Sequence, residues 1–158
     1  MALARFAVAL MIAGTAPAAM AAPTTPLFTS RCGMCHQPDA AGLPGQFPRL
    51  AGRAAAIAAA PGGRRYLALV LLRGMFGKID VDGRPLTGMM PSMGTMKDQE
   101  IADLLTHVTQ LPGAGKPAKK IAPFTAAEIA KVRAEPTMTA QAVGAERAKL
   151  AAAAGFPN

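Results

Sequence analysis

The stretch Cys32-Gly33-Met34-Cys35-His36 decides how this chain folds. It reads C-x-x-C-H, the attachment motif for a c-type haem. Two cysteines three positions apart on a helical turn point to the same side, so both thiols can reach the vinyl groups at one edge of a porphyrin. The adjacent His36 is then held beneath the iron, where a neutral imidazole nitrogen is a suitable axial ligand. The motif therefore predicts one covalent haem, attached through Cys32 and Cys35 and ligated by His36.

The residues alone leave other interpretations of the motif open. C-x-x-C also occurs in redox dithiols, it can form a disulfide in an exported protein, and it can supply half of a zinc site. A structural zinc site needs four ligands, and the chain has only His36 and His107 as histidines. The immediate histidine and the absence of a βαβ pattern favour haem attachment over a dithiol.

The N-terminal segment has the features of a secretory signal peptide. Arg5 precedes an apolar run over residues 6–14, and Ala19-Met20-Ala21 fits the small-residue cleavage rule. The run is too short to cross a bilayer as a helix, although an uncleaved anchor is the alternative. We predict a signal peptide over residues 1–21, cleavage after Ala21, a periplasmic location and no stable membrane span after cleavage.

Composition indicates a small core and a basic surface. Hydrophobic residues make up 51% of the 158 residues, but there are six Phe, one Tyr and no Trp. A haem would supply a large flat apolar body for so thin a core to fold around. The formal net charge is +8, and residues 114–158 hold seven basic and three acidic side chains. For an exported protein this charge favours an acidic docking face on a redox partner over nucleic acid.

Helical patterns and one hairpin flank the glycine-rich and proline-rich loop over residues 37–52. A short helix capped by Thr24 or Thr25 is expected before Cys32. Further helices are expected over residues 64–73, with Leu67, Val70 and Leu71 on one face, and from Asp98 to Leu111. Residues 78–86 are expected to form a hairpin that turns at Asp82-Gly83.

The methionine-rich segment over residues 87–96 is the place to seek a second axial ligand. A thioether sulfur is a soft ligand, and His/Met ligation raises the haem potential. The candidates are Met89, Met90, Met93 and Met96. Each of them could instead fill a gap in the core. His107 could be a ligand only by displacing a methionine.

C-x-x-C-H followed by Gly42, Pro48, Leu50 and Gly52 resembles the class I monohaem bacterial cytochromes c, over roughly residues 27–111. The resemblance implies an all-α fold, the small class I cytochrome c fold around one covalent haem, over residues 22–113. It also implies that the Pro48 carbonyl accepts a hydrogen bond from the other ring nitrogen of the haem histidine.

The second axial ligand follows from the same resemblance. In the family this ligand lies in a Gly-x-Met-Pro sequence, which Gly88-Met89-Met90-Pro91 matches, so Met90 is implied. The chain departs from the family directly after the haem histidine, where Gln37 stands in place of the usual glycine. Tyr66, Arg64 or Arg65 could approach the haem propionates, although a solvated basic turn beside a core tyrosine is the alternative.

Residues 114–158 are expected to form a basic linker and a helical C-terminal extension. Thr125 and Glu128 form a capping box, and residues 138–150 have helical character. We expect a small helix pair without a second haem, because the chain has no further cysteines. This extension could wrap the haem domain or dock on a partner.

The pattern as a whole predicts an electron transfer protein and not an enzyme. With His36 and Met90 on the iron, no position is open to a substrate. We expect a one-electron carrier that passes electrons from a periplasmic dehydrogenase to a cytochrome or oxidase of the respiratory chain. The alternatives are a fixed cytochrome c subunit of a dehydrogenase complex, and a haem enzyme or gas sensor with a labile methionine.

Overall fold

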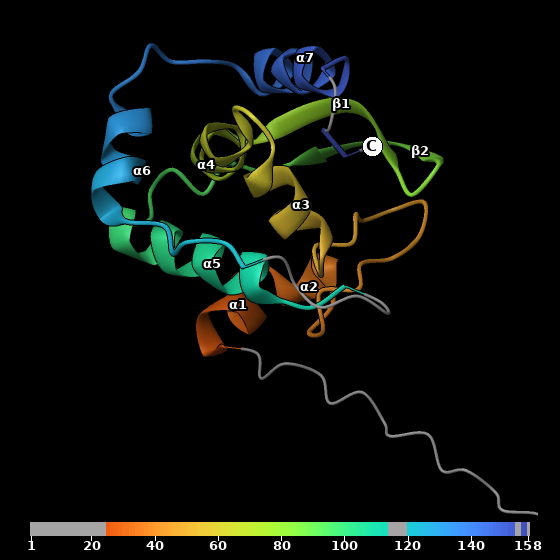
Figure 1. The fold of residues 1–158 in the computed structure, drawn as a ribbon, viewed down its shortest axis with the longest axis horizontal. Coiled ribbons are helices and arrows are strands. Elements are labelled where there is room, and N and C mark those ends of the chain that lie inside the picture. The colour runs from red at the N-terminus through yellow and green to blue at the C-terminus, as the bar shows by residue number, and fades with distance from the viewer. Residues whose placement is uncertain (1–24, 114–119, 154–155, 158) are drawn as a thin grey trace, which may run out of the picture.

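The computed structural model describes residues 25–113, 120–153 and 156–157. The predicted signal peptide and the middle of the predicted linker lie outside these residues. Within them the chain is mainly helical with one two-stranded sheet (Figure 1), in agreement with the expected fold. In chain order the elements are α1 (Pro26–Arg31), α2 (Gly33–His36), α3 (Arg53–Ala59), α4 (Gly63–Arg73), β1 (Met75–Val81), β2 (Arg84–Met90), α5 (Asp98–Gln110), α6 (Ala126–Arg133) and α7 (Ala140–Ala151).

Helix α1 begins as the sequence predicts. The Thr25 hydroxyl accepts a hydrogen bond from the Phe28 N–H at 3.2 Å, and Pro26 occupies the first turn, where its missing N–H costs nothing. Helix α1 ends at Arg31 and α2 begins at Gly33, so Cys32 lies between them. The Cys32 carbonyl accepts a hydrogen bond from the His36 N–H at 2.9 Å. The motif is therefore a single helical turn.

The hairpin is longer than the sequence indicates. The antiparallel ladder runs from Val81 opposite Arg84 to Met75 opposite Met90, and the turn residues Asp82 and Gly83 have φ of 55° and 75°. Positive φ at both positions matches the turns that two-residue hairpin loops favour. In the half of the ladder that is farther from the turn, Gly77 lies opposite Gly88. The sequence there does not alternate between apolar and polar residues, so it did not indicate a strand. Met90 consequently lies at the end of a strand and not in a loop.

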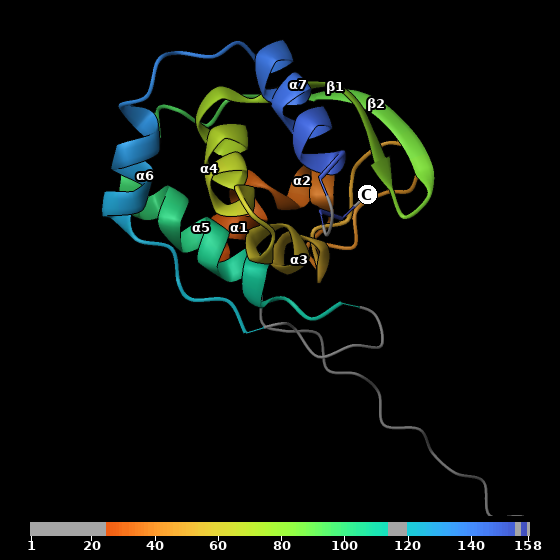
Figure 2. The same ribbon diagram turned by 45° about the horizontal axis from the view of Figure 1, so that its top comes forward.

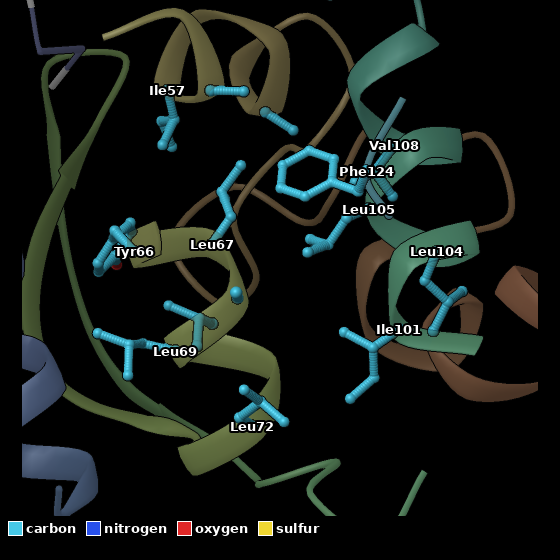
Figure 3. Close-up of a cluster of buried hydrophobic side chains, with 14 of the residues drawn as sticks. Ile57, Tyr66, Leu67, Leu69, Leu72, Ile101, Leu104, Leu105, Val108 and Phe124 are labelled. Carbon is cyan, nitrogen blue, oxygen red and sulfur yellow. The ribbon is translucent and has the colours of Figure 1, made fainter. Parts of the chain in front are cut away.

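Helices α4 and α5 form the core of the molecule (Figure 3). The side chains of Leu69, Leu72, Ile101, Leu104 and Leu105 are at most 2% exposed. Both helices lie within one residue of their predicted bounds at each end. The buried surface of α4 is wider than the single apolar face that the sequence predicts, because Leu69 and Leu72 are buried as well.

Helix α5 crosses α1 at the base of the core. The rings of Phe28 and His107 lie 5.2 Å apart there. Burial lowers the pKa of His107, and its Nε2 is buried without a hydrogen-bond partner among the described residues. His107 is thus a packing residue of this helix crossing.

The C-terminal extension consists of two separate helices and not the expected pair. Figures 1 and 2 show α6 beside α5, and α7 across α4 and β1. Helix α6 begins at the predicted Thr125 cap, whose hydroxyl accepts a hydrogen bond from the Glu128 N–H. Both helices bury apolar side chains against the rest of the chain, since Ile129 and Val143 are 0% exposed.

Arginines of α4 form ion pairs with this extension. Arg64 pairs with Glu128 of α6 at 2.7 Å. Arg65 pairs with Glu135 at 2.7 Å and with Glu146 of α7 at 3.1 Å. Arg64 and Arg65 therefore form ion pairs with the extension, which favours this role for them over the role toward haem propionates.

Candidate haem site

One helical turn carries the two cysteines and the histidine of the motif. Cys32 and Cys35 are both half-buried free thiols, and His36 is 6% exposed. Burial, and then the nearby Cys35, raises the pKa of Cys32 to about 11. Redox dithiols and catalytic cysteines depend on a lowered thiol pKa, because the thiolate is the nucleophile. The environment of Cys32 thus disfavours a dithiol and suits a thiol that is consumed in a stable thioether.

A hydrogen bond to the Pro48 carbonyl orients the imidazole of His36. The distance from His36 Nδ1 to Pro48 O is 2.9 Å. A carbonyl can only accept, so Nδ1 carries the proton and Nε2 keeps its lone pair. Burial lowers the pKa of His36, against a smaller raising effect of this hydrogen bond. His36 is therefore a neutral, oriented imidazole with Nε2 as the available ligand atom, and the hydrogen bond implied by the family resemblance is confirmed.

The residue after this histidine adopts a glycine-like conformation. Gln37 has φ 65° and ψ 154°, a region that side chains other than glycine rarely enter. Gln37 therefore adopts a conformation typical of glycine, the residue that the resembling family usually has at this position. The Gln37 carbonyl also accepts a hydrogen bond from the Ala40 N–H at 3.0 Å, which helps to hold the turn.

The four candidate methionines occupy different environments. Met89 is 69% exposed, whereas Met96 is 9% exposed and packs in the core. Met90 and Met93 are half-buried against the core. Exposure removes Met89 from the protein interior, and core packing gives Met96 the gap-filling role. Met90 and Met93 remain as the methionines with partly free side chains at the core surface.

The backbone around Met90 is fixed to the end of α4. The Ser92 hydroxyl donates to Leu72 O and the Met93 N–H donates to Leu71 O, both at 2.7 Å. These bonds satisfy carbonyls at a helix end that have no partner within the helix. Gly74 allows the backbone at Met90 to lie close to the end of α4, because a Cβ on residue 74 would lie 2.6 Å from Met90 O. The Met90 thioether therefore projects from a rigid part of the fold.

A cavity of about 360 Å³ lies between the loop after α2 and the hairpin. Phe47, Val81 and Leu86 provide apolar walls, and Arg49 and Asp82 lie at its polar side. An ion pair at 2.8 Å joins Arg49 to Asp82. The cavity lining does not include Cys32, Cys35, His36 or Met90, the four predicted haem residues.

Sequence reasoning missed two buried arginines. Arg53 and Arg147 are 6% and 4% exposed. Their positions in the sequence gave no signal of burial, because a helical arginine is usually solvated.

Among the described residues, no three His, Cys, Asp or Glu side chains group in a way that could hold a metal ion. None of the helices in the described part of the chain is both long enough and apolar enough to span a bilayer.

Comparison with known proteins agrees with this geometry. The family model described as Cytochrome c matches residues 21–112. The chain is 48% identical over 121 residues to cytochrome c-552 of Thermus thermophilus, an alignment that covers 77% of this chain and 92% of that protein. A cytochrome c-552 from a particular strain of Thermus thermophilus is also 48% identical over 121 residues, with 77% of this chain and 81% of that protein covered. The chain belongs to the cytochrome c family, as a class I protein whose cofactor is one covalently bound c-type haem.

Proposed function

We propose that this cytochrome is an exported one-electron carrier of the periplasm, and not an enzyme. In this proposal Cys32 and Cys35 attach the haem, and His36 and Met90 supply the two axial ligands. The donor is a periplasmic dehydrogenase, and the acceptor is a cytochrome or oxidase of the respiratory chain. When bound, the haem supplies a one-electron couple between ferric and ferrous iron.

The single observation that carries the proposal is the bond from His36 Nδ1 to Pro48 O. It fixes the tautomer and the ring orientation, so that Nε2 is presented without further rearrangement. The hydrogen bonds from Ser92 and Met93 to α4 hold the backbone after Met90 in the same way. His36 and Met90, held in this way, would remain ligands of a bound haem iron in both oxidation states. This arrangement favours electron transfer over substrate binding.

An exposed apolar side chain beside the attachment motif offers a contact for a redox partner. Met34 lies between the two cysteines and is 86% exposed. Transient redox interfaces are small and gain speed from complementary charge. The full chain has a net charge of +8, and removal of Arg5 with the signal peptide would leave 8 − 1 = +7, so the exported cytochrome is suited to partners with an acidic docking surface.

A visible spectrum of the oxidised holoprotein tests the ligand assignment. Iron–methionine ligation gives a weak band at the red end of the spectrum, and we expect this band in the wild type. Met90→Ala should abolish it, and Met89→Ala should leave it intact, because the Met89 side chain is exposed. Met93→Ala is the decisive comparison, since Met93 is also half-buried. Loss of the band in Met93→Ala and its survival in Met90→Ala would transfer the role to Met93.

A further inference from the structure

Helix α6 of the C-terminal extension ends beside the segment that follows the predicted axial methionine. Residues 91–97 form this segment and join Met90, at the end of β2, to Asp98, at the start of α5. Figures 1 and 2 show α6 next to the end of α5 at which the segment arrives. The last residue of α6 is Arg133, and its side chain reaches back to the segment.

Arg133 binds three acceptors within residues 94–98. Its Nε donates to Asp98 Oδ1 at 2.8 Å, its Nη1 donates to the Gly94 carbonyl, and its Nη2 donates to the Met96 carbonyl at 2.8 Å. A guanidinium presents its donors in a rigid planar fork, so this one side chain fixes two carbonyls and a carboxylate relative to one another. Hydrogen bonds of this kind are stronger than neutral ones because the donor is charged.

The end of α6 is itself bound to α4. Arg73, the last residue of α4, donates from its Nη2 to Arg133 O at 2.9 Å. The same end of α4 accepts the hydrogen bonds of the Ser92 hydroxyl and the Met93 N–H. The segment after Met90 is thus held by two helices, by α4 at its start and by α6 at its end.

The contacts of Arg133 suit control of this segment better than attachment of the extension. The side chains of Arg133 and Asp98 are 32% and 28% exposed, and ion pairs this exposed add little to global stability. Burial of Ile129, which is 0% exposed, attaches α6 to the core. A loop opens locally at a small fraction of the free energy of global unfolding. A few hydrogen bonds therefore change the population of the open loop far more than they change the population of the unfolded chain.

We propose that Arg133 is a positioning residue for the axial methionine, so that α6 of the C-terminal extension stabilises the iron–methionine bond. The proposal rests on the assignment of Met90 in the haem carrier proposed above. Withdrawal of the Met90 thioether from a bound haem iron then requires that the segment leave α4 and α6. Loss of Arg133 favours the open segment, in which His36 is the remaining axial ligand.

Imidazole binding to the ferric holoprotein measures how readily the methionine leaves. Imidazole binds the iron only where the methionine has withdrawn, so its apparent affinity follows the population of the open segment. Arg133→Gln should raise this affinity about tenfold, since loss of one charge-assisted hydrogen bond is enough for such a change. The iron–methionine band should also be lost at a lower urea concentration than in the wild type.

Arg64→Gln is the matched control. Arg64 likewise binds one carboxylate and two carbonyls, those of Glu128, Ala122 and Pro123. Both substitutions remove one positive charge and one set of contacts between the extension and the rest of the chain. The partners of Arg64 do not belong to the segment after Met90, so Arg64→Gln should leave the imidazole affinity within about twofold of the wild-type value.

The outcomes separate this inference from the carrier function. Equal imidazole affinities for the folded Arg133→Gln and Arg64→Gln holoproteins would overturn the inference. The carrier would still stand in that case, provided that the wild type shows its iron–methionine band. Absence of the band from the wild type would instead count against the ligand assignment on which the carrier rests.

Native-state hydrogen exchange of the wild-type holoprotein gives the answer if Arg133→Gln does not fold. The Ala134 N–H, bonded to Ala130 O at 3.0 Å, reports opening at the end of α6, and the Met93 N–H reports opening of the segment. As urea is raised, both amides should become exchangeable with the same opening free energy, because Arg133 joins the two regions. A Met93 amide that stays protected, with the iron–methionine band intact, where the Ala134 amide already exchanges would refute the inference.

Discussion

Gln37 holds a backbone conformation that costs free energy at the haem-binding turn. Its φ of 65° and ψ of 154° lie in a region that is essentially open to glycine alone. The turn is needed because the chain must leave α2 and bring the Pro48 carbonyl back to His36 Nδ1. Correct placement of the imidazole therefore outweighs the local strain at this residue.

Gln37→Gly should stabilise the holoprotein. Relief of the strain gains about 1–3 kcal/mol, and the greater freedom of glycine in the unfolded chain takes back roughly 0.5–1 kcal/mol. A net gain of about 1 kcal/mol is expected, seen as a rise of a few degrees in Tm on thermal unfolding. Gln37→Ala is the control, because alanine keeps the unfavourable φ. Equal stability of the alanine and glycine variants would show that the side chain, and not the backbone, is at issue.

At the scale of elements, the contact between α7 and β1 depends on one glycine. A Cβ on Gly144 would lie 2.2 Å from Phe76 O. Backbone atoms at both sides cannot move without shifting the strand or the helix. Because Arg147 lies one turn further along α7, this contact also helps to set where its guanidinium lies.

Gly144→Ala tests whether that contact outweighs helix propensity. Propensity alone predicts that alanine stabilises α7 by about 1 kcal/mol. The clash with Phe76 O predicts a net loss of about 1–3 kcal/mol. We expect the loss, measured as a lower urea midpoint of the holoprotein. Ala148→Gly, at an exposed position of the same helix, calibrates the propensity effect; a Gly144→Ala protein more stable than the wild type would mean that α7 does not lie this close to β1.

For the whole molecule, local rules in the sequence predicted the parts that depend on neighbouring residues. The C-x-x-C-H turn, the Thr25 and Thr125 caps and the hairpin turn all involve residues within a few positions. The hydrogen bond from His36 to Pro48 could be predicted only from the resemblance to a known family. These are the parts of the fold and of the haem site that a single sequence specifies.

The remaining parts depend on pairs that lie far apart in the chain. Arg64 and Glu128 are 64 positions apart, and Arg65 and Glu146 are 81 apart. No periodicity links such positions, so the sequence could not show that the extension packs on its own chain. For the same reason nothing in the sequence marked Arg147 as buried, although it is 4% exposed beside Tyr66.

The extension is held to the molecule mainly by apolar burial, and its ion pairs add little. Ile129 is 0% exposed, and Phe124 is 4% exposed and lies beside side chains of α4 and α5 (Figure 3). The Phe124 N–H also donates to the Thr106 hydroxyl of α5 at 2.8 Å. In contrast, the side chains of Arg64 and Glu128 are 29% and 30% exposed, and such pairs contribute at most about 1 kcal/mol.

Adjacent substitutions on α6 separate these two contributions. Ile129→Ala should lower the free energy of unfolding of the holoprotein by about 2–5 kcal/mol, because it leaves a cavity in the core. Glu128→Gln keeps the side-chain length and breaks only the charge pair, so it should cost less than about 1 kcal/mol. Both values come from urea unfolding at pH 7 in low salt. If the extension were attached to the surface mainly by charge, Glu128→Gln would lower the free energy of unfolding more than Ile129→Ala does.

The pH dependence provides an independent check on the same pair. Arg64 holds the pKa of Glu128 below its ordinary value. The folded state therefore binds this proton less tightly than the unfolded state does, so the pair stabilises the fold above the ordinary Glu pKa of about 4.3. As the pH falls from this value through the lowered pKa of Glu128, the contribution of the pair is lost. The free energies of unfolding of the wild type and of Glu128→Gln should therefore converge. The Ile129→Ala deficit should persist at the same pH, because no titrating group is involved; a deficit that disappeared with the charge pair would assign the attachment of α6 to electrostatics.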